Sequence, residues 1–191
     1  MAVKEKIQYS RTEDRIYGFD TTNSTSASPS SVIANKLLCY VVHGLSSPFT
    51  IPAGYYFHGS LTTNVFHSLT LDVLKLLTDC GFIVLRIMTD NYSSNVSLFK
   101  SLSGGSVMKN YIDHPYLSSL PLFLSFDFCH ALKNARNLFL QRDMYSSDGI
   151  ISAKFLKTLY EMQKGLPIKP VKYLTRRHLY PTNFEKMKVL R

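Results

Sequence analysis

The order of apolar segments along the chain constrains its fold more than any other feature of the sequence. Two apolar runs come first, at 36–45 and 49–58, and the Ser-Ser-Pro connection between them predicts an antiparallel hairpin. Apolar residues then recur with helical spacing over 62–79, and the glycine at position 81 marks the end of that predicted helix. This region therefore predicts two paired strands followed by an amphipathic helix.

Strands and helices alternate in the apolar pattern that follows. Short apolar strands are predicted at 82–88 and 122–126, and a helix is predicted after each, over 93–102 and from 127 to about 140. A third such helix is predicted over 152–164. Because antiparallel strands come first and helical crossovers come later, we expect an α/β fold with one mixed sheet and flanking helices.

The N-terminal region has a different pattern. Partly alternating segments at 4–9 and 15–19 surround a polar turn and predict a further hairpin. The stretch 21–31 consists almost entirely of Ser, Thr, Asn and Ala with one Pro, and we expect a flexible loop there.

The composition is that of a folded chain, with 45% hydrophobic and 18% charged residues. No apolar run reaches the ~18 residues that a membrane-spanning helix needs, and the N-terminus lacks the apolar core of a signal peptide. We therefore expect an intracellular protein without a membrane partner. The three cysteines, Cys39, Cys80 and Cys129, are far apart and predict buried free thiols rather than disulfides or a zinc site.

Positive charge is concentrated in the C-terminal third. Residues 1–129 contain nine of the 22 Lys and Arg residues and nine of the 13 Asp and Glu residues. Residues 130–191 contain the other thirteen basic and four acidic residues, and so supply the whole net charge of +9. We therefore expect two domains, 1–129 and 130–191. The basic segment is either a surface for phosphate groups or a solvated face without a partner.

Two aspartates, Asp90 and Asp127, each follow a predicted strand and precede a predicted helix. A carboxylate in this position can hold a divalent cation, because the sheet fixes the backbone and the loop leaves the oxygens accessible. An aspartate there can equally cap the helix through its side-chain oxygen. The sequence leaves both roles open for both residues.

His130 follows Asp127 by three residues, which places it within reach across the first helical turn. Lys133, Arg136 and Asn137 share roughly one face of the helix with it. A histidine on such a polar face points to a functional group, while a hydrogen-bonded core histidine stays an open alternative.

Several motifs together carry a family likeness. They are MAVKEKIQY, LLCYVVHGL with IPAGYYFHG, IMTDNYSSN, FDFCHALKNARN, and LTRRHL with FEKMKV. With these motifs, in family order and nearly end to end, the chain resembles P element-type DNA transposases, the group that includes the THAP-domain transposase relatives. The resemblance implies an RNase H-like domain over 1–129 with a shortened first strand. The start of the family's helical GTP-binding insertion domain would follow over 130–191.

The resemblance implies DNA cleavage and strand transfer by two Mg²⁺ ions held by carboxylates. Asp90 would be the second catalytic carboxylate and a metal ligand. The most specific motif is the D-x-x-H element of Asp127 and His130, and this family signature continues with Lys133, Arg136 and Asn137. DNA is the implied partner, and the nucleus is the implied location.

Two members of the family's catalytic set have no counterpart in the printed residues. The family's first Asp lies in an Asp-Glu pair just before the methionine that matches Met1, and its final Glu follows the insertion domain. Asp20 is a poor substitute for the first Asp, because it follows the N-terminal hairpin. We therefore expect a fragment that is catalytically incomplete, and leave open whether it is an enzyme. Because the shortened first strand would leave backbone amides unpaired, we also expect the fragment to be marginally stable.

The family's insertion domain binds GTP, and the match around VKYLTRRHL and FEKMKVL gives Lys172, Lys188 and Val189 as candidates for nucleotide contact. The basic charge of this segment suits phosphate but equally suits DNA. Two alternatives to a transposase fragment stay open. One is a domesticated DNA- or nucleotide-binding module without catalysis, and the other is an unrelated α/β enzyme with Asp90 and His130 in its site.

Overall fold

The computed structural model of the chain divides into two compact units, each described here by itself. The residues that it describes are 2–22, 32–105 and 107–182. The first unit comprises Met1–Ile87 and Tyr92–Ser125, and the second comprises Met88–Asn91 and Phe126–Arg191. The domain boundary expected after residue 129 stays a prediction. Most of the polar stretch expected as a flexible loop lies outside the described residues.

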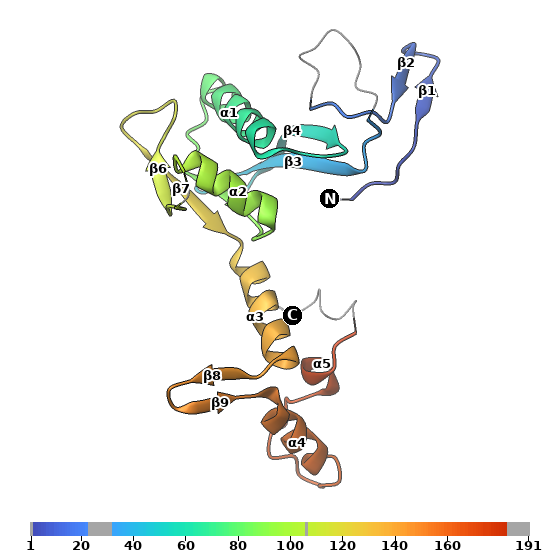
Figure 1. Ribbon diagram of the computed structural model, residues 1–191, viewed down its shortest axis with the longest axis vertical. Helices are drawn as coiled ribbons and strands as arrows, with labels where there is room; N and C mark the ends of the chain where they lie inside the picture. Colours follow the sequence, from blue (N-terminus) through green and yellow to red (C-terminus); the bar gives the residue numbers. More distant parts are fainter. Residues whose placement is uncertain (1, 23–31, 106, 183–191) are drawn as a thin grey trace. The chain divides into compact units, whose positions relative to one another are not determined.

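The fold is mixed α/β, as the apolar pattern predicts (Figure 1). The elements are, in chain order, β1 (Gln8–Ser10), β2 (Arg15–Tyr17), β3 (Lys36–His43), β4 (Thr50–His58), α1 (Thr63–Asp79), β5 (Arg86–Thr89), α2 (Ser93–Leu102), β6 (Tyr111–Asp113), β7 (Pro121–Phe126), α3 (Phe128–Gln141), β8 (Met144–Ser146), β9 (Gly149–Ile151), α4 (Ala153–Gln163) and α5 (Arg176–Leu179). None of the described helices is long and apolar enough to cross a membrane.

Strands β3 and β4 form the predicted antiparallel hairpin, and α1 packs on one of its faces (Figure 1). Alternation along the strands directs every second side chain toward the helix. On the helix side, α1 buries Phe66, Thr70, Val73 and Leu74. The side chains left exposed on the hairpin include Val41, Ile51, Tyr55 and Phe57. The hairpin therefore has a covered face and a face that is open within the described residues.

Strands β5, β6 and β7 form a separate sheet with the order β5-β7-β6. The amide of Phe123 donates to Leu85 O (2.9 Å) and the amide of Asp127 donates to Thr89 O (2.7 Å), so β5 and β7 run parallel. β6 pairs antiparallel with β7, which makes the sheet mixed. The expected single sheet is thus found as two among the described residues. The sequence pattern did not predict β6.

The resemblance implies a shortened first strand near the N-terminus. Among the described residues, one isolated bridge lies there. Ala2 bridges to Lys36 at the start of β3, and Val3 N donates to Asn35 O (2.8 Å). The following residues turn away into β1, which pairs with β2 as the predicted N-terminal hairpin.

Asp20 makes hydrogen bonds with Thr22 and with Val32, the residues on either side of the undescribed segment. Its side chain has 6% of its surface exposed and accepts hydrogen bonds from Thr22 N (2.8 Å), Thr22 Oγ1 (2.6 Å) and Gly59 N (3.0 Å). Burial acts to raise the pKa of Asp20, but these hydrogen bonds outweigh it and leave the pKa below its usual value. The Asp20 amide donates to Val32 O (2.8 Å). Asp20 therefore has a structural role.

The cysteines are free, but their predicted burial is wrong for Cys39 and Cys80, which are exposed. Cys39 alternates with the helix-facing residues of β3, so its side chain lies on the open face of the hairpin. Cys80 is the C-cap of α1, beyond the buried stripe of that helix. Cys129 is half-buried.

The described residues of the second unit include the helices α3, α4 and α5 and the hairpin of β8 and β9 (Figure 1). Strands β8 and β9 pair antiparallel. The helix predicted over 152–164 is α4, which is capped by Ser152. Helix α4 contacts both α3 and α5. The buried residues of this unit are few among those described, and they are Ser152, Ala153, Gln163 and Leu179.

Candidate functional site

The two strand-end aspartates of the sequence prediction belong to neighbouring parallel strands. Asp90 follows β5 and Asp127 follows β7, and the amide of Asp127 bonds to Thr89 O at 2.7 Å. Because parallel strands end at the same edge of a sheet, both aspartates leave the sheet at one edge. This edge is the candidate functional site, and Asp90, Asn91, Asp127 and α3 all belong to the second unit.

Asp127 is the N-cap of α3, one of the two roles that the sequence left open. One carboxylate oxygen accepts from Cys129 N at 2.9 Å, and the other lies 2.6 Å from His130 Nδ1. The hydrogen bond from His130, together with that from Cys129 N, holds the pKa of Asp127 below its usual value of 3.8. Asp127 therefore stays ionised at neutral pH and fixes the start of α3.

His130 is not the core histidine that the sequence left as an alternative. Its side chain is 48% exposed, and its Nδ1 faces the carboxylate of Asp127. With Nδ1–H donating to Asp127, the neutral ring carries its lone pair on Nε2. The carboxylate thus fixes both the orientation and the tautomer of the ring. This is the arrangement that a proton acceptor or a metal ligand uses.

A second contact at this edge was missed by the sequence prediction. Asn134 Nδ2 donates to Asn91 Oδ1 at 2.8 Å and joins α3 to the residue that follows Asp90. Asn134 lies one helical turn after His130, so the spacing of Asp127, His130 and Asn134 on one side of α3 was the available signal. The bond links the side chain of the residue next to Asp90 with α3.

The remaining signature residues lie farther along α3. Arg136 donates from Nη2 to Arg177 O at 2.9 Å, so its guanidinium ties α3 to α5. Lys133 and Asn137 are half-buried on the same helix. The structure brings Asp127 and His130 together at the strand ends and directs Arg136 to another partner.

The donor set was assessed for Mg²⁺, which the family resemblance implies. Asp90 is half-buried, and the Thr89 hydroxyl donates to its carbonyl oxygen at 3.0 Å. The Asp127 oxygens are engaged by His130 and Cys129. Within residues 2–22, 32–105 and 107–182, no three His, Cys, Asp or Glu side chains are grouped so that they could hold a metal ion. The described residues therefore fit one ligand of a Mg²⁺ site and not a complete site.

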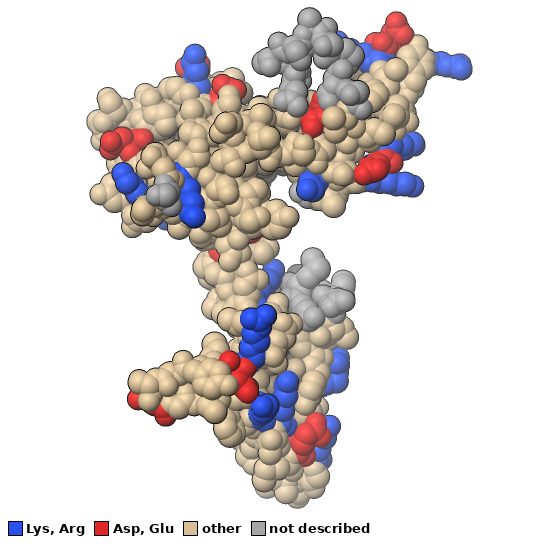
Figure 2. All heavy atoms as spheres, viewed as in Figure 1, with Lys and Arg blue, Asp and Glu red and all other residues tan. Residues whose placement is uncertain are grey.

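Of the three residues expected to contact a nucleotide, only Lys172 is described. It is exposed in the segment between α4 and α5, and its Nζ lies 5.8 Å from the centre of the Tyr173 ring. Lys188 and Val189 lie outside the described residues. Figure 2 shows several Lys and Arg side chains on the visible face of the second unit.

Comparisons with known proteins identify domains in both parts of the chain. Residues 1–103 match the family described as TNP-like, RNase H N-terminal domain. Residues 129–191 match the TNP-like, GTP-binding insertion domain. The curated human protein DNA transposase THAP9 is 26% identical over 143 residues, which are 73% of this chain and 16% of that protein.

A solved structure supports the same fold. The structure titled Drosophila P element transposase strand transfer complex matches with a TM-score of 0.77 and 19% sequence identity. The match covers 98% of this chain and 38% of that chain, so the 191 residues span well under half of either relative. Because the family match covers more than half of the residues and agrees with the fold, the chain belongs to the P element-type, TNP-like transposase family, with an RNase H-like domain and a GTP-binding insertion domain.

Proposed function

We propose that this chain is a part of a P element-type transposase that binds DNA and contributes Asp90 to a divalent-metal site. The observation that carries the proposal is the common edge formed by the ends of β5 and β7, where Asp90 follows one strand and the Asp127–His130 pair follows the other. In this arrangement Asp90 is the candidate ligand, while Asp127 and His130 fix the neighbouring junction.

In the resembled family, Mg²⁺ activates a water or a 3′-hydroxyl and stabilises the leaving oxygen during DNA cleavage. One carboxylate does not hold two such ions. We therefore propose that these 191 residues are catalytically incomplete by themselves and supply one of the three acidic ligands. The chain's own contribution is to present Asp90 at the end of β5, next to Asn91, whose side chain is bonded to Asn134 of α3.

The second part of the proposal concerns nucleotide binding by the second unit. The family match to a GTP-binding insertion domain supports it, as does the basic charge of residues 130–191. Lys172, Lys188 and Val189 are the residues proposed to contact GTP. A nuclear location is proposed with the DNA partner.

The alternative is a domesticated module that binds DNA or nucleotide without any catalysis. The uneven charge favours it, since the basic excess lies in 130–191 while the candidate metal ligand lies outside that range. In this alternative Asp90 has no metal role, and the basic segment alone accounts for function.

Mg²⁺-dependent nicking of supercoiled DNA by the 191-residue protein, with Asp90→Asn beside it, tests catalytic incompleteness. We expect no nicking by either protein. Nicking by the wild-type chain that disappears in Asp90→Asn would overturn incompleteness and establish Asp90 as a catalytic ligand. The metal role is tested by Mn²⁺ titration followed by paramagnetic broadening of NMR signals, which we expect near Asp90 and not in the variant. Equal broadening in both proteins would favour the alternative.

DNA binding is tested by its dependence on salt. If the basic segment contacts about four phosphates, the affinity should fall roughly 100-fold between 50 and 200 mM NaCl. Replacing Lys169 and Lys172 by Gln should remove about two phosphate contacts. The plot of log affinity against log salt concentration should become less steep accordingly. The equal charge change at the exposed Lys4 and Lys6 of the first unit should leave the slope unchanged. Equal effects of the two pairs would show that the second unit has no specific role in DNA binding.

A further inference from the structure

Gln163, the last residue of α4, is buried to an extent that is unusual for a glutamine. Only 1% of its surface is exposed. Its amide is hydrogen-bonded at both ends, because Nε2 donates to Leu174 O at 3.3 Å and Oε1 accepts from Val171 N at 3.2 Å. Buried amides are kept where such bonds offset their loss of hydration. The two bonds hold the backbone on either side of Lys172 and Tyr173.

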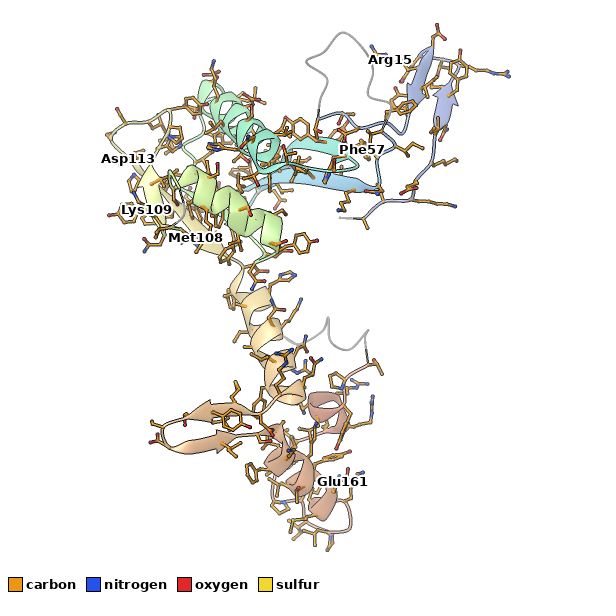
Figure 3. All side chains as sticks on the ribbon, in the orientation of Figure 1. Arg15, Phe57, Met108, Lys109, Asp113 and Glu161 are labelled. Carbon is orange, nitrogen blue, oxygen red and sulfur yellow. The ribbon has the colours of Figure 1, made fainter. Side chains whose placement is uncertain are left out.

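The lysines on and beside α4 differ from Lys172 in their partners. Three of them bond to an acceptor within the second unit, and these are Lys154 with Asp143 (3.0 Å), Lys157 with Leu140 O (3.3 Å) and Lys164 with Glu161 (2.7 Å). Figure 3 labels Glu161 on α4. Lys172 contacts the Tyr173 ring, and the described residues give its ammonium group no oxygen acceptor. Its charge therefore remains available to an anion.

The segment that carries Lys172 needs to be held in place if that lysine is to act. Residues 165–174 contain one Gly and two Pro and lie mostly exposed between α4 and α5. A loose segment would lose conformational entropy when Lys172 binds a phosphate, and this loss would weaken the binding. The bonds from the buried Gln163 side chain to Val171 and Leu174 already order this segment in the folded protein. The conformational entropy is therefore lost on folding and not on phosphate binding.

We propose that Gln163 is a positioning residue for nucleotide binding, which holds the 165–174 segment so that Lys172 faces the phosphates of the nucleotide. The inference rests on the nucleotide binding proposed above and adds a residue that does not itself touch the ligand. Gln163 acts through the backbone at Val171 and Leu174.

The test is a calorimetric titration of the 191-residue protein with GTP in the presence of Mg²⁺. Gln163→Met keeps the length of the side chain and removes both hydrogen bonds, and we expect GTP to bind about tenfold more weakly. Lys172→Met should weaken binding by about tenfold or more, because it removes a charge-assisted contact. If Gln163 acts through Lys172, the double variant should bind GTP as Lys172→Met does.

Two further variants keep the test informative. Gln141→Met makes the same substitution at an exposed position on α3 and should leave GTP affinity unchanged. Val171→Pro removes the amide that Gln163 accepts from, at a loop position outside the buried cluster, and should weaken GTP binding even if Gln163→Met does not fold. Hydrogen exchange should show faster exchange of the Val171 amide in Gln163→Met.

The possible failures are distinguishable. If the wild-type chain does not bind GTP, the proposed nucleotide binding fails and this inference fails with it. If Lys172→Met weakens binding while Gln163→Met and Val171→Pro bind as the wild type does, only the role of Gln163 is overturned. Additive effects of Gln163→Met and Lys172→Met would also overturn it, since they would show that the two residues act independently.

Discussion

At the residue scale, Asp127 shows how a helix cap can organise a functional edge. Its two oxygens serve different neighbours, since one receives the Cys129 amide and the other receives His130 Nδ1. The same ionised group therefore starts α3 and selects the tautomer of the histidine. Substitutions at this position separate the two effects, because an asparagine can still cap a helix but carries no charge.

Asp127→Asn is expected to make the melting temperature depend less on pH in the acid range. The pKa of Asp127 is lowered in the folded protein, so its ionised form adds stability above the unfolded value of about 3.9, and this is lost as pH falls through the folded pKa. The wild-type melting temperature should therefore fall more steeply than that of the variant between about pH 5 and pH 2. Circular dichroism melting at several pH values measures this.

The matched control is Asp113→Asn, at an exposed aspartate on β6 that Figure 3 labels. It should leave the acid slope of the wild type in place. Equal slopes for wild type and Asp127→Asn would show that the bond from His130 does not contribute to stability.

At the element scale, a partly buried hydrogen bond joins β3 to α1. The Thr70 hydroxyl donates to Phe66 O at 2.7 Å, so its lone pair accepts the proton of Tyr40 Oη at 2.9 Å. Burial raises the pKa of Tyr40 well above its usual value and keeps the phenol protonated as the donor. This hydrogen bond therefore joins β3 to the face of α1 that packs on the hairpin.

Tyr40→Phe is expected to lower the free energy of unfolding by about 1 kcal/mol, because it removes the donor and keeps the ring. Tyr55→Phe on the neighbouring strand makes the same change at a side chain that is 67% exposed, and it should have almost no effect. Urea unfolding followed by circular dichroism compares the two. A larger loss for Tyr55→Phe would indicate that the open face of the hairpin is the one that matters for stability.

The sequence predicted most of the elements, because long apolar runs and helical spacing carry their own signal. It missed β6, a strand of three residues that pairs with β7. It also predicted a single sheet for strands that lie in two separate sheets. At the candidate site it predicted Asp127 and His130 as neighbours, since they are one helical turn apart. It could not predict the Asn91–Asn134 contact, which depends on how α3 follows a parallel strand pair. The metal and nucleotide roles of the site residues stay predictions.

At the scale of the whole molecule, much apolar surface remains open. Phe128 and Leu132 on α3 and Phe155 on α4 are at least half exposed, and no residue of α3 is buried. Burial of apolar surface is the main source of stability, so helices with open apolar stripes gain little from packing. These exposed side chains are a second reason, besides the shortened first strand, to expect marginal stability.

The 191-residue protein is therefore expected to melt in a broad transition below about 60 °C, a temperature near the top of the usual mesophile range. Differential scanning calorimetry measures the midpoint and the width. The two compact units give a further reason for breadth, since they need not unfold together. A sharp, cooperative transition above that temperature would show that the exposed apolar side chains do little to lower the thermal stability of the fold.

The Asp20 clasp has a consequence for how the gene can vary. Asp20 accepts hydrogen bonds from Thr22 and Gly59 and donates its amide to Val32 O. These bonds hold the two ends of an eleven-residue span, counted from Thr22 to Val32. Once the ends are fixed, doubling the length of a connection costs only about 0.6 kcal/mol. This span is therefore a place where the coding sequence can gain or lose codons with little penalty. It is also where an epitope or a fluorescent label can be introduced without disturbing the β3–β4 hairpin.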